Sequence, residues 1–219
     1  MTKNVSLKII QVCLGITLTL FSSSTPAKEW PFTVYLDGKE IGQHRFSLNE
    51  ANGLRELTSQ AKFNVKFLFI NAYQYQHTAN ERWQGDCLSS LDASTKENRE
   101  ITLVKGRMEE HSFLLEAAKK TATLPACVMT FAYWNPKILS QNKLLNPQTG
   151  EWLEVKIKAL GVEPIEVKGQ TVSAERYRID ASKLQIELWY SADKAITEKK
   201  WLALKSTTPE GYEIFYKLR

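Results

Sequence analysis

Residues 57–83 alternate apolar and polar side chains more regularly than any other part of the chain, and this pattern constrains the fold most. A period of two is what a half-buried β-strand requires, because successive side chains point to opposite faces of a sheet. The face of the first expected strand carries Leu57, Ser59, Ala61, Phe63, Val65, Phe67 and Phe69. The same face of the next strand carries Tyr73, Tyr75, His77, Ala79, Glu81 and Trp83.

The rest of the chain is also dominated by short strand signals separated by turns. Residues 30–36 and 41–48 flank Asp37-Gly38, a two-residue hairpin signal. Further strands are expected near 88–94, 101–104, 108–115, 152–160, 164–168, 171–179, 184–190, 200–206 and 212–218. Residues 117–125 are expected to form a polar connection. Residues 129–141 are the one helical prediction, with a break and restart at Asn135-Pro136.

These elements predict a mainly β protein. Ten or more sequential strands favour a single curved antiparallel sheet or an incomplete β-barrel. The short helical segment near 129–141 is expected to cover the concave face. The connections are short and no repeat interrupts them, so residues 28–219 are expected to form one domain.

The first 27 residues have the order of a secretion signal. Lys3 and Lys8 precede an apolar run, and small residues follow with Thr25 and Ala27 at the −3 and −1 positions of a peptidase site. We therefore expect cleavage after Ala27 and release into the periplasm. An uncleaved N-terminal anchor is the alternative.

Charge argues against a nucleic-acid partner. The formal net charge of +5 falls to +3 when Lys3 and Lys8 are removed. The remaining charges alternate in sign along the chain, and no basic arm is present to neutralise a phosphate backbone. We expect no nucleic acid among the partners, whereas a transient contact with a membrane surface is compatible with this charge.

Two cysteines remain after signal cleavage, Cys87 and Cys127. An even pair in an oxidising compartment predicts a disulfide. The alternative is a catalytic thiol, which would need a nearby histidine and would be at risk of oxidation in the periplasm.

Motifs for catalysis and cofactors are missing from the sequence. It contains no Gly-x-Ser-x-Gly elbow, no His-Glu-x-x-His helix, no phosphate loop and no dinucleotide fingerprint. His77 and Glu81 share a strand face, but four residues of strand separate them by roughly 13 Å, too far to bind one metal ion together. We therefore expect no cofactor and no metal, although a metal site assembled across strands stays open.

Aromatic side chains are the main candidates for a binding surface, because clefts for small molecules are largely apolar with a few polar groups. We assign one set of aromatic residues as the walls and gate of the expected binding site. His77 and Glu81 are assigned as polar anchors at the rim of that site. The set comprises Phe67, Tyr73, Tyr75, Trp83, Phe131, Tyr133 and Trp134. The same aromatic residues would also suit a filled hydrophobic core.

Several motifs together resemble an uncharacterised family of proteobacterial secreted proteins. They are Trp30-Pro-Phe-x-Val-x-Leu-Asp-Gly-x-x-Ile-Gly, Tyr75-x-His77-x-x-x-Glu81-x-Trp83-x-x-x-Cys87-Leu88, Leu124-Pro-x-Cys127, Phe131-Ala-Tyr-Trp-Asn-Pro136 and Leu144-Leu-Asn-x-Gln-Thr-Gly150. The strand and turn pattern of Leu184-x-Ile-x-Leu-Trp-Tyr190 followed by Trp201-x-Ala-x-Lys205 is more distantly similar to periplasmic lipoprotein-carrier proteins. That similarity implies an open half-barrel with a lipid-binding concave face.

These observations predict a non-enzymatic periplasmic protein that binds or carries a lipid or another apolar small molecule. One alternative is an envelope enzyme, a hydrolase or isomerase of a lipid-like substrate with His77 and Glu81 as acid and base. Another is a structural protein of the envelope that pairs with a partner through an exposed strand edge.

Overall fold

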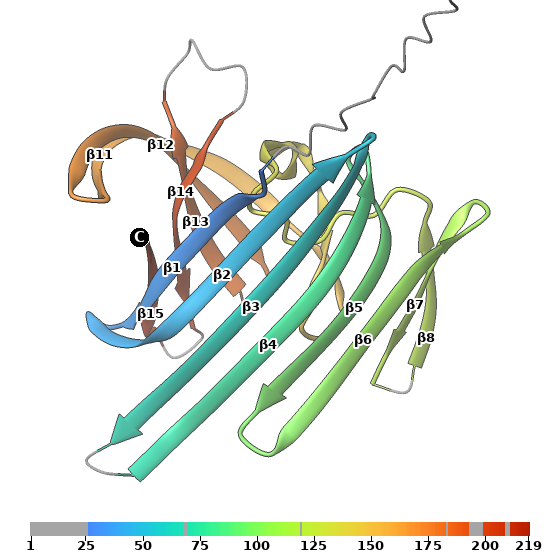
Figure 1. The fold of residues 1–219 in the computed structure, drawn as a ribbon, viewed down its shortest axis with the longest axis horizontal. Helices are drawn as coiled ribbons and strands as arrows, with labels where there is room; N and C mark the ends of the chain where they lie inside the picture. The colour runs from blue at the N-terminus through green and yellow to red at the C-terminus, as the bar shows by residue number, and fades with distance from the viewer. Residues whose placement is uncertain (1–25, 68–69, 119, 183, 193–198, 209–210) are drawn as a thin grey trace, which may run out of the picture.

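A computed structural model describes residues 26–67, 70–118, 120–182, 184–192, 199–208 and 211–219, without the side chains of residues 66–72. In these described ranges, thirteen strands form one antiparallel sheet in the order β11-β12-β13-β14-β15-β1-β2-β3-β4-β5-β6-β7-β8. The sheet curves strongly but does not close, because β11 and β8 are its two free edges (Figure 1). The prediction of a mainly β protein with a single curved antiparallel sheet is confirmed.

The sheet consists of two meanders. The first contains β1 (Lys28–Leu36), β2 (Lys39–Ala51), β3 (Leu54–Phe67), β4 (Ile70–Gln84), β5 (Cys87–Glu97), β6 (Glu100–Glu109), β7 (Ser112–Ala117) and β8 (Lys120–Pro125). The second contains β11 (Lys156–Val167), β12 (Gln170–Ala181), β13 (Leu184–Ser191), β14 (Trp201–Thr207) and β15 (Glu213–Leu218). Antiparallel pairing of β1 with β15 joins them.

Local turn chemistry follows the sequence. Asp37 and Gly38 both have positive φ, +45° and +82°, between β1 and β2. Two successive positive φ angles define the type I′ turn, whose twist matches that of the flanking strands. The predicted Asp37-Gly38 hairpin is therefore confirmed.

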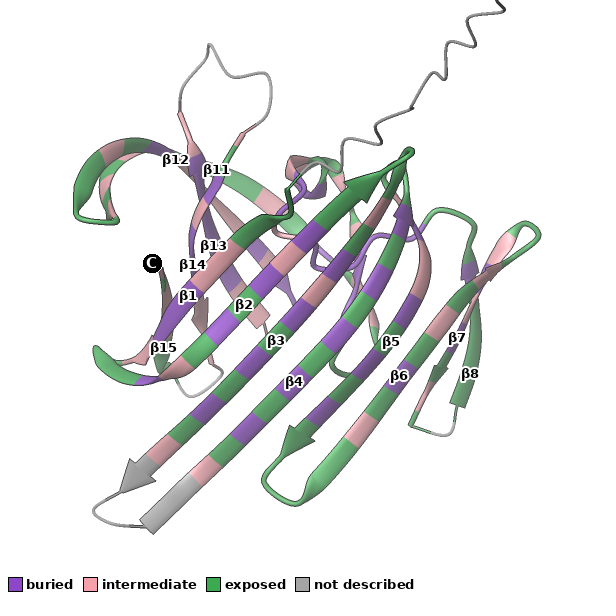
Figure 2. Cartoon of the chain, in the orientation of Figure 1, coloured by how far each residue is buried: buried purple, intermediate pink, exposed green. Residues whose placement is uncertain are grey.

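The alternation of buried and exposed residues is visible along β2 to β5 in Figure 2. Leu57, Ser59, Ala61 and Phe63 are buried on the concave face of β3, and the residues between them face outward. The same holds for Tyr75, His77, Ala79, Glu81 and Trp83 on β4. Both predicted inner faces are thus correct where the structure describes them.

The helical prediction for 129–141 is wrong. Only Pro136–Ser140 forms a short 3-10 helix, η1, with the Asn135 side chain accepting a hydrogen bond from the backbone of Lys137. Residues before Pro136 instead lie beside β9 (Lys143–Leu145): the Phe131 amide donates to the Leu145 carbonyl and the Leu145 amide donates to the Met129 carbonyl. A backbone paired with a neighbouring strand cannot also form the i to i−4 bonds of a helix.

A second difference concerns residues 117–125, which were expected to be a polar connection. Residues 120–125 form the edge strand β8, which pairs with β7. Five of its six residues are exposed, so the polarity of this stretch reflects an edge position rather than a loop. The expected strand near 152–160 is also divided: β10 (Trp152–Glu154) pairs with β9, and β11 begins at Lys156.

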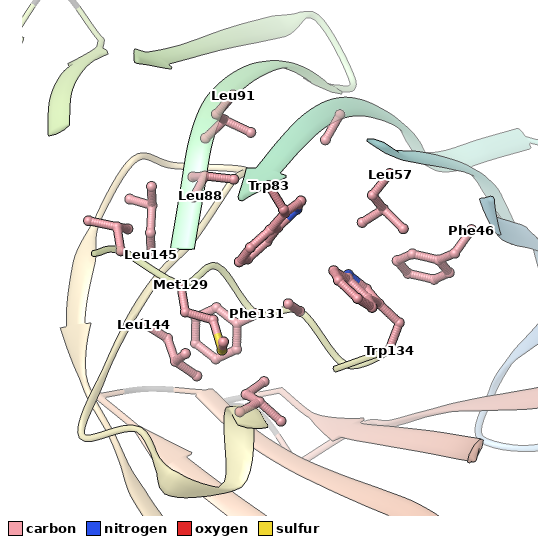
Figure 3. Close-up of a cluster of buried hydrophobic side chains, with 14 of the residues drawn as sticks. Phe46, Leu57, Trp83, Leu88, Leu91, Met129, Phe131, Trp134, Leu144 and Leu145 are labelled. Carbon is pink, nitrogen blue, oxygen red and sulfur yellow. The ribbon is translucent and has the colours of Figure 1, made fainter. Parts of the chain in front are cut away.

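The chain between the two meanders, residues 126–155, is here called the crossing segment. It runs from β8 to β11 through the hollow of the sheet (Figure 1). Figure 3 shows Met129, Phe131 and Trp134 of this segment packed against strand residues such as Trp83. The rings of Trp83 and Trp134 meet edge to face at 5.5 Å. This segment supplies the hydrophobic core that the predicted helix was expected to supply.

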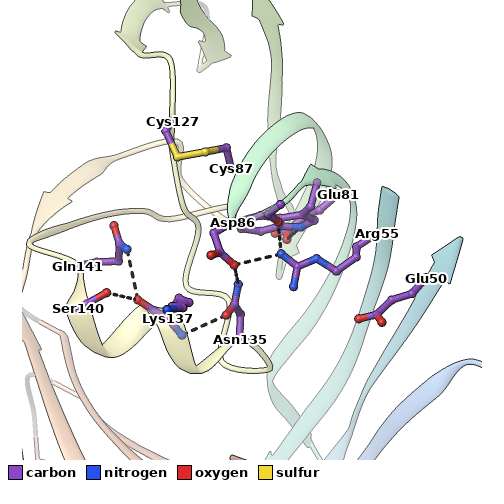
Figure 4. Close-up of polar contacts among 12 residues, drawn as sticks. Glu50, Arg55, Glu81, Asp86, Cys87, Cys127, Asn135, Lys137, Ser140 and Gln141 are labelled. Atoms are coloured by element: carbon purple, nitrogen blue, oxygen red, sulfur yellow. Dashed lines mark hydrogen bonds and ion pairs between the residues drawn. A yellow bond between two sulfur atoms is a disulfide. The ribbon is translucent and has the colours of Figure 1, made fainter. Parts of the chain in front are cut away.

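Cys87, the first residue of β5, and Cys127 form the predicted disulfide, with their Cα atoms 4.7 Å apart (Figure 4). Next to it, the amide of Leu88 donates to the carbonyl of Val128 at 2.9 Å. The side chain of Asn135 donates to Asp86, which also pairs with Arg55 of β3. These contacts attach the crossing segment to one end of the first meander.

No helix in the described ranges is long and apolar enough to cross a membrane.

Candidate functional site

A row of polar and small side chains crosses the middle of the concave face. His44 of β2 lies opposite Ala61 of β3, Ala61 lies opposite His77 of β4, and His77 lies opposite Thr95 of β5. Because a strand exposes every second residue on one face, this register brings the two histidines to either side of a small alanine.

Both histidines are buried and bonded to hydroxyl groups. His44 Nε2 is 2.8 Å from Ser59 Oγ, and His77 Nδ1 is 2.9 Å from Thr95 Oγ1. Burial lowers the pKa of His77 to about 4. Burial, together with the nearby His77, lowers the pKa of His44 to about 3. Both imidazoles are therefore neutral at physiological pH.

Glu81 lies on the same face of β4 as His77, as the sequence predicts. Its Oε2 accepts hydrogen bonds from Trp83 Nε1 at 3.0 Å and from Thr130 Oγ1 of the crossing segment at 3.3 Å. Burial raises the pKa of Glu81 to about 7, and the two hydrogen bonds partly oppose this rise. The carboxyl is therefore divided between its two protonation states near neutral pH.

This pKa predicts a pH-dependent effect of the substitution Glu81→Gln. A carboxyl whose pKa rises from 4.5 to about 7 on folding stabilises the protein below pH 4.5, and that contribution is lost as the pH rises through 7. Glutamine does not titrate. We expect Glu81→Gln to gain on the order of 2 kcal/mol relative to the wild type between pH 5 and pH 8.

Urea denaturation of both proteins at the two pH values measures this difference. The lowered pKa values of His44 and His77 make stability fall as the pH drops below 6.5, but both proteins share this contribution and it cancels in the comparison. A difference between variant and wild type that stays constant with pH would contradict the raised pKa.

A second group of apolar side chains lies on the concave face beyond the crossing segment. We call it the strand-only cluster, because every member comes from β1, β2, β3, β4 or β15. Its buried members are Val34, Ile41, Ala61, Phe63 and Tyr75. Around them lie side chains that are only partly buried: Leu36, Val65, Tyr73, Ile214 and Tyr216.

Aromatic rings organise the strand-only cluster. The rings of Phe63 and Tyr75 are stacked at 5.1 Å, and Tyr73 stacks on Tyr75 at 6.5 Å. The ring of Tyr216 lies 6.3 Å from Phe63 and 5.8 Å from His44. Burial raises the pKa of Tyr75, and the neighbouring hydroxyl of Tyr216 raises it further.

The sequence-predicted ligand residues divide between these two regions. Trp83, Phe131 and Trp134 are buried in the core built around the crossing segment. Tyr73 and Tyr75 belong to the strand-only cluster. Tyr133 is partly buried beside the main core, where its ring lies 5.5 Å from that of Trp201. The side chain of Phe67 lies outside the described residues.

The acid–base pair of the enzyme alternative does share the concave face. However, the described partners of Glu81 are Trp83 and Thr130, both buried in the protein interior. A carboxylate held by two core donors is suited to tying the crossing segment to β4. The geometry therefore favours a structural role for Glu81.

Three residues in or beside the strand-only cluster were not assigned to a site from the sequence: His44, Phe63 and Tyr216. Phe63 was placed on the correct face but not assigned to the site, and His44 falls within an expected strand. Tyr216 comes from the last strand of the chain. Only the pairing of β15 with β1 brings it close to β2 and β3, and no local pattern indicates that pairing.

Two open hollows lie on the surface, and the second shares Phe63 with the strand-only cluster. One, of about 480 Å³, is lined by Asn142, Lys143, Glu154, Val155, Lys156, Asp180, Ala181 and Ser182. The other, of about 250 Å³, is lined by Lys62, Phe63, Asn64, Gln74, Gln76, Lys96 and Asn98. Both linings are mainly polar or charged, so neither resembles a site for an apolar molecule.

The free edges of the sheet do not favour the strand-pairing alternative. Edge strand β8 has six residues, starts with Lys120 and ends with Pro125. Edge strand β11 contains Pro164 and an irregularity between Ala159 and Gly161. Short length, proline, lysine and bulges are the features that keep edge strands from pairing with another chain.

Comparison with known proteins identifies a family for this chain, but that family has no described activity. The family model described as "Domain of unknown function (DUF6134)" matches residues 32–219, which is nearly all of the expected mature chain. No curated protein matches the chain.

Proposed function

We propose that this chain, which belongs to the DUF6134 family, is a periplasmic protein that binds the apolar part of a lipid or another small molecule. The binding surface is the strand-only cluster on the concave face. The predicted secretion signal supports the location, and the aromatic side chains of the cluster support the class of ligand.

The observation that carries the proposal is the uneven covering of the concave face. The main core combines strand residues with residues of the crossing segment, such as Phe131, Ile138 and Leu145. The strand-only cluster contains no residue of the crossing segment, and its outer members are only partly buried. An apolar surface that continues from a buried cluster to a partly exposed rim marks a place where another apolar group can bind.

This location differs from the one expected from sequence. The expected site lay beneath Phe131, Tyr133 and Trp134, acting as a gate. Phe131 and Trp134 are instead packed against the protein's own core side chains (Figure 3). Of the described aromatic residues assigned from sequence, Tyr73 and Tyr75 belong to the proposed site, and Tyr133 of the crossing segment is close enough to Tyr75 to raise its pKa.

Binding of the neutral fluorescent dye 1-N-phenylnaphthylamine tests the proposal. Val65 belongs to the rim of the strand-only cluster, so Val65→Arg places a charge where the dye's rings would lie. Bringing an apolar molecule against an arginine desolvates the charge. We expect the dissociation constant for the dye to rise about tenfold or more, equivalent to about 1.4 kcal/mol.

Ile101→Arg is the matched control, because Ile101 is 63% exposed and lies outside this cluster. It should leave dye binding within about twofold of the wild type, and circular dichroism should show both variants folded. A wild-type protein that does not bind the dye, or equal binding by both arginine variants, would exclude the strand-only cluster as the site.

A further inference from the structure

Among the residues that the structure describes, His44 has a buried polar atom with no hydrogen-bond partner. Only 9% of the residue is exposed, and its Nε2 is bonded to Ser59 Oγ. Its second ring nitrogen, Nδ1, is fully buried and makes no hydrogen bond. Most buried polar groups in proteins are hydrogen-bonded, and leaving one unpaired costs about 1–3 kcal/mol. An unpaired nitrogen beside the strand-only cluster is therefore a candidate contact for a ligand.

Tyrosine hydroxyls lie close to one another in this region, and the ring of one of these residues, Tyr216, lies beside that of His44. The rings of Tyr216 and Phe63 lie 5.8 Å and 6.3 Å from the His44 ring. The Tyr75 hydroxyl is close enough to those of Tyr216 and Tyr133 for each to raise its pKa. Within the described part of the chain, no hydrogen bond joins the hydroxyls of Tyr75, Tyr133 or Tyr216 to another protein atom. The region thus combines an apolar surface with several hydrogen-bonding groups that have no partner among the described residues.

The electrostatics of this region select against a charged ligand. The described residues of the strand-only cluster and its rim are all apolar or tyrosine, so none supplies a lysine or arginine. The lowered pKa of His44 keeps its imidazole neutral as well. A carboxylate or phosphate buried here would lose its hydration without gaining a counter-charge, which is unfavourable.

We propose that the site binds an uncharged amphiphile, whose hydroxyl or carbonyl head bonds to His44 Nδ1 and the Tyr216 hydroxyl while its apolar chain lies along Phe63 and Val65. This inference rests on the proposed function, because it assigns a head-group chemistry to the same surface. Neutral histidine and tyrosine both donate and accept hydrogen bonds, so they suit alcohols, esters and amides.

Displacement of 1-N-phenylnaphthylamine by 1-decanol and by decanoate at pH 8 tests the inference. The two competitors share a ten-carbon chain and differ mainly in the charge of the head. We expect decanol to displace the dye at a concentration at least about tenfold lower than decanoate. Tyr216→Phe, which removes only the hydroxyl, and His44→Phe should each weaken decanol binding about threefold to tenfold, as expected for the loss of one hydrogen bond.

Tyr212→Phe is the matched control, because Tyr212 is 53% exposed and lies outside the cluster. Both dye affinity and decanol affinity of Tyr212→Phe should stay within about twofold of the wild type, since this residue lies outside the proposed site. Tyr216→Phe keeps the aromatic ring and so tests the inference even if His44→Phe fails to fold.

The outcomes separate the two proposals. If the wild type binds the dye but decanoate displaces it as well as decanol does, the uncharged head group is refuted and apolar binding stands. Decanol binding that is unchanged in both Tyr216→Phe and His44→Phe refutes the assigned contacts. A wild type that binds neither dye nor decanol refutes both proposals.

Discussion

Replacing Trp83 with alanine is expected to lower the free energy of unfolding by about 3–5 kcal/mol, the usual range for removing a large buried aromatic side chain. Trp83 is fully buried on β4 and meets the ring of Trp134 from the crossing segment. Its indole nitrogen also donates to the buried carboxyl of Glu81. The substitution thus opens a cavity between sheet and crossing segment and removes a donor from a buried acid.

Urea denaturation followed by circular dichroism measures this loss. Trp83→Phe keeps an aromatic ring but removes the indole N–H, so its loss should be smaller than that of the alanine variant. Ile101→Ala, at an exposed position, serves as the control and should change stability by less than about 0.5 kcal/mol. A loss below about 1 kcal/mol for Trp83→Ala would mean that the crossing segment does not form the core as described.

The double substitution of Cys87 and Cys127 by serine is expected to cost about 4 kcal/mol. In the chain-entropy model, a disulfide stabilises by restricting the unfolded chain, and a separation of 40 residues corresponds to about that value. The bridge attaches the start of the crossing segment to β5, so its loss should also release this segment from the concave face more often. Replacing both residues avoids leaving a reactive thiol.

Two measurements check this expectation. The midpoint of urea denaturation should be lower in the double variant, and the wild type under reducing agent should approach the same midpoint. Limited proteolysis should cut the variant faster within residues 126–155, with the fragments identified by mass spectrometry. A double variant as stable as the oxidised wild type would show that the bridge contributes nothing to holding the crossing segment.

Both predictions concern the crossing segment because it determines how much of the concave face stays open. The segment is attached by the disulfide at one end and by Asn135 with Asp86 farther along (Figure 4). Its side chains complete the core over one part of the sheet, whereas the strand-only cluster is built from strands alone. The proposed binding surface depends on this division.

The strands were predicted correctly where one face of the strand is buried and the other is exposed to solvent. On β3 and β4, alternation alone placed Phe63, Tyr75, His77 and Glu81 on the inner face, because a strand with one buried face must repeat with a period of two. The Asp37-Gly38 turn and the cysteine pair were also predictable, since each depends on residue chemistry that is visible locally.

The crossing segment was mispredicted for an equally physical reason. Residues 129–141 were predicted to be helical, but Met129, Phe131 and Trp134 are buried in an irregular chain that pairs with β9. When nearly every side chain of a segment is buried, periodicity no longer reports its secondary structure. The contacts that decide its conformation come from distant strands.

The β-rich class, the inner faces of β3 and β4 and the identity of the disulfide could be predicted from the sequence alone, because they follow from alternation and from counting cysteines. The tertiary structure alone decided that the Phe131–Trp134 region is filled and that Tyr216 lies beside His44. Both depend on pairing between residues far apart in the chain, where β15 joins β1 and the crossing segment enters the hollow of the sheet. Local sequence carries no record of such pairing, since its free energy arises only when the whole sheet has formed.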